Sequence, residues 1–152
     1  MIKLIGVGKI KDNHLASLIN DYVSKINHYH KFEIVEVKDE SITSDENSVL
    51  DIEASRALKQ IKDDEYVILL DLHGSSIDSI SLSKKIDNLL CHYSKITFVI
   101  GGSLGLGKEL IKRANERIKL SDLTFLHQMT RLIVCEQIYR SFKILNNETY
   151  HK

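Results

Sequence analysis

Two short apolar runs, residues 66–72 (YVILLDL) and Ile96–Ile100 (ITFVI), constrain the fold of this chain more than any other feature. Neither run alternates apolar with polar residues, as a strand with one face in water would. Near-continuous apolar runs of this length are typical of strands that helices cover on both faces, as in parallel sheets. We therefore expect the remaining sequence to supply those helices.

Strand-like and helix-like segments alternate along the whole chain. Strand patterns occupy Ile2–Val7, Phe32–Val37, 66–72, Ile96–Ile100 and 117–125, and helical spacing of apolar residues marks 12–29, 49–61, 77–93, 108–115 and 129–145. This order, without a composition break or a repeat, predicts one α/β domain over residues 1–152 with a mostly parallel sheet flanked by helices. Ligands bind beyond the carboxyl ends of strands in such sheets, which selects three loops: after Leu72, after Ile100 and around residues 120–127.

The composition excludes several classes of protein. Hydrophobic residues make up 43% of the chain, but no apolar run approaches the roughly 20 residues of a membrane helix. The first residues lack the small-residue cleavage site of a signal peptide. Cys91 and Cys135 lie far apart, which predicts buried thiols in a reducing compartment, and the histidines show no metal-ligand spacing. We expect a cytoplasmic protein with no membrane association and no metal.

The charge is unevenly distributed along the chain. The net charge is zero, but residues 1–107 carry 12 basic and 16 acidic side chains, whereas residues 108–152 carry 9 and 5. A basic second part either presents a positive surface to an anionic partner or reflects a chance imbalance of solvated faces. Zero net charge by itself argues against strong attraction to nucleic acid.

The glycine-rich segment GGSLGLGKE, residues 101–109, follows the second apolar run directly. From Gly102 its spacing is that of a nucleotide-binding P-loop up to Lys108, but Glu109 replaces the Ser or Thr that holds magnesium. A carboxylate in the first helical turn repels phosphates, so the turn favours a ligand with little phosphate, which glycine allows close to the backbone. A turn without any ligand, a P-loop-like hydrolase and a non-catalytic binding module stay open as alternatives.

Three further features are candidates for a functional role. In residues 119–128 (KLSDLTFLHQ), backbone groups flanked by Leu and Phe are able to clasp a planar ring, although a strand edge with a helix cap has the same pattern. His127 and Arg131 are four residues apart and share a helix face if the helix begins that early, and Glu136 and Arg140 form a similar pair. The chain ends Tyr150-His151-Lys152, a tail that the residues alone predict to be disordered.

Four stretches together carry a family resemblance. VIGGSLGLGKEL, LSDLTFLHQMTR, EQIYRSFKI and the terminal YHK resemble, in order and spacing, the RlmH family of bacterial rRNA methyltransferases, and the similarity extends over essentially the whole chain. The family belongs to the SPOUT class, so the resemblance implies a C-terminal trefoil knot and a homodimer. One departure is Leu126, which stands where the family usually has a proline. Leucine leaves that turn less constrained.

The resemblance also implies a reaction and a cofactor. S-adenosyl-L-methionine would donate the methyl group, and N3 of a pseudouridine in 23S rRNA of the large ribosomal subunit would accept it. Matched position by position, the implied cofactor-binding residues are Leu70, Gly101, Leu120, Ser121, Asp122, Leu123, Thr124 and Phe125. A sulfonium nucleoside carries no phosphate, which agrees with Glu109.

The family's catalytic region corresponds to His127, Arg131, Tyr150, His151 and Lys152. The N3 proton has to leave, and either His127 or His151 is suited to accept it near neutral pH. Arg131 or Lys152 would stabilise the developing anion, and Tyr150 would stack on the base or hydrogen-bond to it. We expect the tail to complete the site of the partner chain. We also expect the neutral enzyme to recognise the assembled ribosome by shape, not free RNA by charge.

Overall fold

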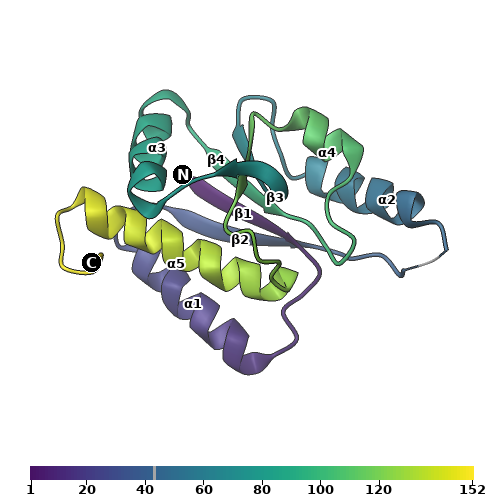
Figure 1. The fold of residues 1–152 in the computed structure, drawn as a ribbon, viewed down its shortest axis with the longest axis horizontal. Coiled ribbons are helices and arrows are strands. Elements are labelled where there is room, and N and C mark those ends of the chain that lie inside the picture. Colours follow the sequence, from purple (N-terminus) through teal and green to yellow (C-terminus); the bar gives the residue numbers. More distant parts are fainter. Residues whose placement is uncertain (43) are drawn as a thin grey trace.

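The computed structural model describes residues 1–42 and 44–152, and its strands form one parallel sheet (Figure 1). The strands are β1 (Ile2–Val7), β2 (Phe32–Val37), β3 (Tyr66–Ser76), β4 (Ile96–Ile100) and β5 (Glu116–Lys119). Their order across the sheet is β2-β1-β4-β3-β5, and all four pairings are parallel. The predicted α/β class with a mostly parallel sheet is therefore confirmed.

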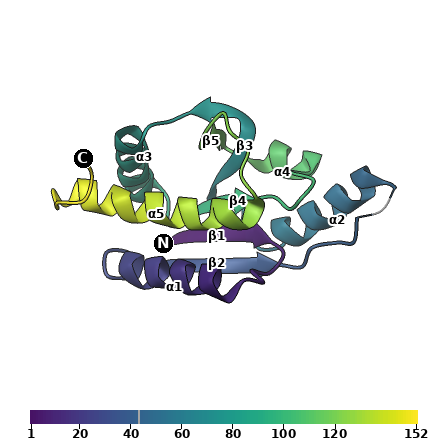
Figure 2. The same ribbon diagram turned by 60° about the horizontal axis from the view of Figure 1, so that its bottom comes forward.

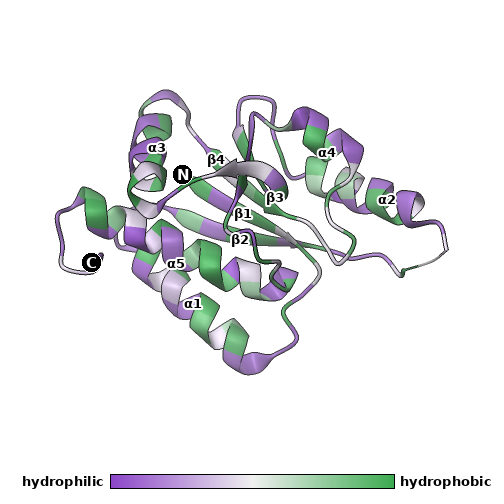
Figure 3. Ribbon diagram, in the orientation of Figure 1, coloured by the Kyte–Doolittle hydropathy of each residue, from purple (hydrophilic) through white to green (hydrophobic). Residues whose placement is uncertain are grey.

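Helices lie on both faces of this sheet (Figure 2). They are α1 (Asn13–Asn27), α2 (Glu46–Leu58), α3 (Ser79–His92), α4 (Lys108–Arg113) and α5 (His127–Leu145). Helices α1, α3 and α5 share one apolar cluster with strand residues such as Leu4, Ile68 and Phe98, whereas α2 and α4 share another with Ile5, Leu69 and Val99. Successive residues of the central strands thus point to opposite faces, which is why these strands are apolar throughout. The helices themselves alternate apolar and polar bands (Figure 3).

Three of the boundaries that differ from the prediction bear on the site. Strand β3 continues past its predicted end at residue 72 to Ser76, because β5 pairs with it on the side away from β4. A register shift makes both Leu70 and Ser75 of β3 partners of Ile118. Strand β5 ends at Lys119, so most of the predicted extended segment 117–125 is a loop. Helix α5 begins at His127, two residues before the predicted start at 129.

The structure corrects one expectation about the thiols. Cys135 of α5 is buried, but Cys91 of α3 is exposed. None of the described helices combines the length and the apolar character that a membrane span requires. Within residues 1–42 and 44–152, no three His, Cys, Asp or Glu side chains are grouped so as to hold a metal ion. The trefoil knot stays a prediction from the resemblance.

Candidate active site at the carboxyl edge of the sheet

The three loops selected from the sequence meet around one cleft of about 740 Å³. The cleft opens where β4 ends at Ile100, whose neighbours across the sheet are Leu70 of β3 and Gly6 of β1. Its walls are segment 70–73, the glycine-rich turn 100–106 and residues from 117 to 130. All three loops that were selected from the sequence thus contribute to one cleft at the carboxyl ends of the strands.

Most of the residues that the resemblance assigns to the cofactor line this cleft. Seven of the eight do so: Leu70, Gly101, Leu120, Ser121, Leu123, Thr124 and Phe125. Asp122 does not, since its side chain is 90% exposed and pairs with Lys119 at 2.5 Å. The hydrogen bond from Lys119 holds the pKa of Asp122 below its usual range. Among the assigned residues, Asp122 therefore stabilises the loop from outside the cleft.

The cleft wall does not include the lysine of a P-loop, and the two basic residues that it does include, Arg117 and Lys119, are paired with Asp71 and Asp122. Apolar side chains such as Ile100, Leu106 and Ile111 stand beside the backbone of the turn. Lys108 and Glu109 are exposed in the first turn of α4, and neither is part of the cleft wall. Lys108, which has the position of the P-loop lysine, therefore lies outside the cleft wall. This removes the main argument for a P-loop-like hydrolase.

An ion pair that was not predicted from the sequence crosses the outer side of the cleft. Arg117 of β5 donates to Asp71 of β3 at 3.1 Å, and both residues line the cleft. Asp71 lies in β3, one residue beyond the level at which the neighbouring strand β4 ends, and ligand-binding residues of parallel sheets gather at such an edge. That position was the available signal, but the periodicity of a continuous apolar run does not reveal a partner 46 residues away.

His127 is the first residue of α5, and it lines the cleft. Partial burial and the positive charge of Arg131 lower the pKa of its imidazole, and the smaller effect of the negative charge of Asp39 offsets part of this shift. The imidazole is therefore neutral near pH 7 and able to accept a proton. The helix start at His127 also satisfies the condition under which His127 and Arg131 share a face.

Arg131 is buried and binds the backbone at the end of β1. Its side chain is 1% exposed, and its Nη2 donates to the carbonyl oxygens of Val7 at 2.5 Å and Gly8 at 2.7 Å. Its Nη1 donates to Glu36 at 3.0 Å, whereas its Nε has no hydrogen-bond partner among the described residues. Burial lowers the pKa of Arg131, and Glu36 opposes that shift. Arg131, which the resemblance assigns to the catalytic region, is therefore not part of the cleft wall within one chain.

The C-terminal tail folds back on the middle of α5. The Tyr150 hydroxyl donates to Glu136 at 3.0 Å and lies 3.5 Å from the Tyr22 hydroxyl of α1. Arg140 donates twice to the same Glu136 oxygen and stacks 4.7 Å from the Tyr150 ring centre. Burial and the hydrogen bonds to Tyr22 and Glu136 raise the pKa of Tyr150. Glu136 and Arg140 are thus more than a solvated pair, since together they hold the tail.

His151 and Lys152 end the chain near a second hollow. His151 lines a space of about 420 Å³ together with Leu120 and Phe125, which also line the main cleft. Its Nδ1 lies 3.4 Å from Nη1 of Arg140. Lys152 is exposed and is not part of either wall. Within one chain, the five predicted catalytic residues are therefore not gathered around one cleft.

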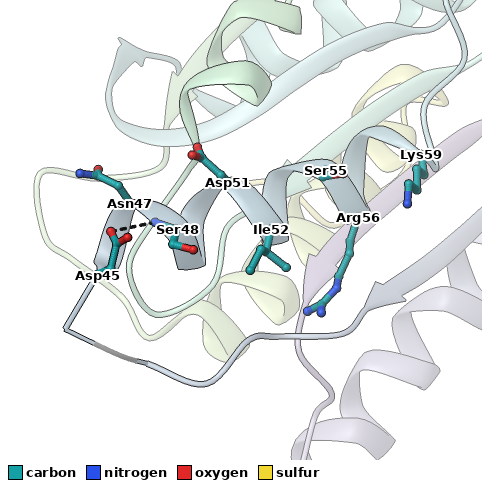
Figure 4. Close-up of a pocket in the computed structure, with 8 residues that line it drawn as sticks. All are labelled: Asp45, Asn47, Ser48, Asp51, Ile52, Ser55, Arg56 and Lys59. Carbon is teal, nitrogen blue, oxygen red and sulfur yellow. Dashed lines mark hydrogen bonds between the residues drawn. The ribbon is translucent and has the colours of Figure 1, made fainter.

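A third hollow, of about 490 Å³, runs along the outer side of α2 (Figure 4). All of its walls come from α2 and its two caps, with Asp45 capping Ser48 at one end and Lys59 at the other. Side chains from several elements do not converge there, as they do in the cleft. This surface is consequently a weaker candidate for chemistry.

Comparisons with known proteins agree with this geometry. A family model described as a predicted SPOUT methyltransferase matches residues 1–151. The chain is 45% identical to a ribosomal RNA large subunit methyltransferase H from Acetivibrio thermocellus, and 44% identical to one from Enterococcus faecalis. Each alignment covers 99% of both chains.

A solved structure shows the same fold at low sequence identity. It is described as a probable methylase family protein from Haemophilus influenzae, with a TM-score of 0.55 and 16% identity over 99% of this chain and 70% of that chain. The departure of Leu126 from the usual proline leaves the start of α5 intact, because Thr130 still donates its N–H to the Leu126 carbonyl at 2.9 Å. The chain belongs to the SPOUT methyltransferase family and, within it, to the RlmH group that its sequence resembles.

Proposed function

We propose that this methyltransferase uses S-adenosyl-L-methionine to methylate N3 of a pseudouridine in 23S rRNA. The observation that carries the proposal is the cleft at the end of β4, in which seven of the eight assigned residues line one space of about 740 Å³. The names of the relatives, which are large-subunit rRNA methyltransferases, support the same class of substrate.

The donor set of the cleft fits a sulfonium nucleoside. Leu70, Leu120 and Phe125 supply apolar surface for an adenine ring, and the turn at Gly101 supplies backbone groups for the ribose. No triphosphate-binding cation is required, in agreement with the exposed position of Lys108. Bound there, S-adenosylmethionine would supply an electrophilic methyl group. The protein's own task is to hold the acceptor in line with it and to take up the N3 proton.

His127 is the proton acceptor that the geometry favours, since it borders the cleft and its pKa is lowered. His151 is the alternative, because it stands on the far side of the Leu120 and Phe125 loop. Tyr150 and Lys152 would then contact the base and its developing negative charge. Arg131 would act indirectly, by fixing the start of α5 against β1.

A homodimer would bring these groups together. Leu123 and Leu126, beside the cleft, are 71% and 63% exposed, and Met129 extends the same apolar surface along α5. Large exposed apolar side chains in one place are typical of an interface. We propose that a second copy covers this surface and presents its tail to the cleft, so that each site contains residues of both chains. An enzyme with this substrate works in the cytoplasm, on the assembled ribosome.

One titration series tests the proposal. S-adenosylmethionine and S-adenosylhomocysteine should bind in calorimetry without metal, whereas ATP with magnesium should not. Transfer of a labelled methyl group should then occur to ribosomes that lack the modification, and far less to a short naked RNA of the same sequence. Binding of ATP dependent on Lys108 would instead favour a nucleotide hydrolase, and the absence of any nucleoside binding would favour a non-catalytic module.

A further inference from the structure

Glu53 of α2 is a buried carboxyl group with one unused oxygen. The residue is 5% exposed, and its Oε1 accepts the backbone N–H of Glu40 at 3.0 Å. Its Oε2 has no hydrogen-bond partner among the residues that the structure describes. Arg56, one turn further along α2, does not serve it, since Arg56 binds the 38–40 connection. A buried acceptor without a donor is costly, so it calls for an explanation.

The unused oxygen points at the glycine-rich turn. A β-carbon on Gly102 would lie 2.8 Å from Glu53 Oε2, so a side chain there would force the Glu53 carboxyl group or the turn to shift. Gly102 is also part of the cleft wall. Leu106, near the other end of the turn, packs on the cluster that contains Ala54. Helix α2 therefore packs against the turn, and Glu53 is the polar side chain in this contact.

We propose that Glu53 is a positioning residue of the cofactor site: its free oxygen accepts a hydrogen bond from the turn 101–107 when the cleft is filled. The inference rests on the proposed function, because it takes S-adenosylmethionine as the ligand. Through its other oxygen, the same carboxyl group fixes Glu40 in the connection between β2 and α2. Glu53 thus links that connection to the turn, and it acts on the ligand only through the turn.

The first test compares three ligands in two variants of the protein. Glu53→Gln keeps the shape but can offer only one acceptor oxygen, so either Glu40 or the turn loses its partner. We expect Glu53→Gln to weaken S-adenosylmethionine, S-adenosylhomocysteine and adenosine by the same factor, about tenfold. Glu46→Gln, an exposed carboxyl group on the same helix, is the matched control and should change none of the three affinities.

A second measurement separates positioning from mere packing. In the wild type, S-adenosylmethionine should slow amide hydrogen exchange in residues 101–107, and in Glu53→Gln this protection should fall. The methyl group of Gly102→Ala should strike the Glu53 carboxyl group and weaken S-adenosylmethionine binding. In the double variant with Glu53→Ala this clash is gone, so the loss of affinity should be smaller than the sum of the two single losses.

Several results would overturn the inference. Loss confined to ligands that carry the methionine group would mean direct contact with the ligand, not action through the turn. Unchanged affinity and exchange in Glu53→Gln, or additive effects of Gly102→Ala and Glu53→Ala, would leave Glu53 a packing residue only. If the wild type bound no S-adenosylmethionine, the proposed function itself would fail, and that outcome is visible before any variant is made.

Discussion

The guanidinium group of Arg131 occupies the space that a side chain at residue 6 would need: a β-carbon on Gly6 would lie 2.5 Å from Arg131 Cζ. Arg131 comes from α5 and Gly6 from β1, and the same arginine also donates to the carbonyl oxygens of Val7 and Gly8. The start of the helix that carries His127 is thereby fixed to the end of the first strand.

Gly6→Ala should accordingly destabilise the protein by about 2 kcal/mol, because the added methyl group overpacks a filled site. Arg131→Ala should cost about 2–4 kcal/mol, since it leaves buried carbonyl oxygens without donors. The double variant should lose less than the sum of the two, because the arginine that the methyl group would strike is gone. Urea unfolding measures all three, and Lys112→Ala on the exposed face of α4 should stay within about 0.5 kcal/mol of wild type. Additive losses at residues 6 and 131 would contradict the contact.

Removing the tail should separate catalysis from cofactor binding. Deletion of residues 149–152 takes away Tyr150, His151 and Lys152, none of which lines the cleft. Methylation of ribosomes should fall by about 100-fold or more, while the affinity for S-adenosylhomocysteine stays unchanged in calorimetry. Tyr150→Phe, which removes the hydroxyl bound to Glu136, should give a smaller loss. Thr149→Ala is the control, and full turnover by the truncated protein would contradict a role for the tail.

Stability should fall as the pH drops from about 7.5 to about 5.5. Burial lowers the pKa of both His30 and His127 below 6.5 in the folded protein. In this interval the unfolded chain binds more protons than the folded one, so acid favours unfolding. Carboxyl groups with lowered pKa, such as Glu65, act only at lower pH, near and below 4.5. Urea unfolding of His127→Asn at both pH values should show a smaller drop than the wild type does, and an equal drop would exclude His127 as a source.

The two thiols should differ sharply in reactivity. Burial raises the pKa of Cys135 to about 12, and Cys91 is exposed. Because the thiolate is the reacting form, iodoacetamide at neutral pH should label the native protein once, at Cys91, and label it twice after denaturation. Mass spectrometry of the peptides identifies the sites. Rapid labelling of Cys135 in the native protein would mean that α5 opens more readily than its packing indicates.

Lys108 should be dispensable for the nucleoside. The residue is exposed and lies outside the cleft wall, so Lys108→Ala should bind S-adenosylmethionine with wild-type affinity. The matched change inside the cleft is Leu120→Ala, which removes apolar surface and should weaken binding about tenfold or more. A large loss of S-adenosylmethionine affinity in Lys108→Ala would contradict this prediction and favour a P-loop-like role for Lys108.

Local pattern was sufficient to predict the layers of this fold and the place of its cleft. Strands such as Ile96–Ile100 are apolar on both faces, and the ends of parallel strands meet at one edge, so the three loops followed from the order of elements. The local pattern could not predict which way side chains point or which residues they pair with. The outward turn of Asp122 depends on Lys119, and the burial of Arg131 depends on a strand more than 120 residues earlier.

Long-range pairing also explains the misplaced boundaries. Strand β3 was expected to end at residue 72, but β5 pairs with it as far as Ser76. The roles of Glu36, Glu53 and Glu136 were missed for a similar reason. Each is a charged residue whose partner comes from another element or from the chain end, and single-sequence periodicity contains no information about such a partner.

The cleft exists because neighbouring strands differ in length. Strand β4 stops at Ile100, whereas β3 beside it runs six residues beyond Leu70, the residue level with Ile100. The cleft occupies the space into which β4 would extend if it continued beyond Ile100. The glycine-rich turn closes it there. Insertions or deletions between Gly101 and Gly107 would therefore change the size of the cleft without altering the pairing of the strands. The choice of ligand can change in this way while the sheet stays the same.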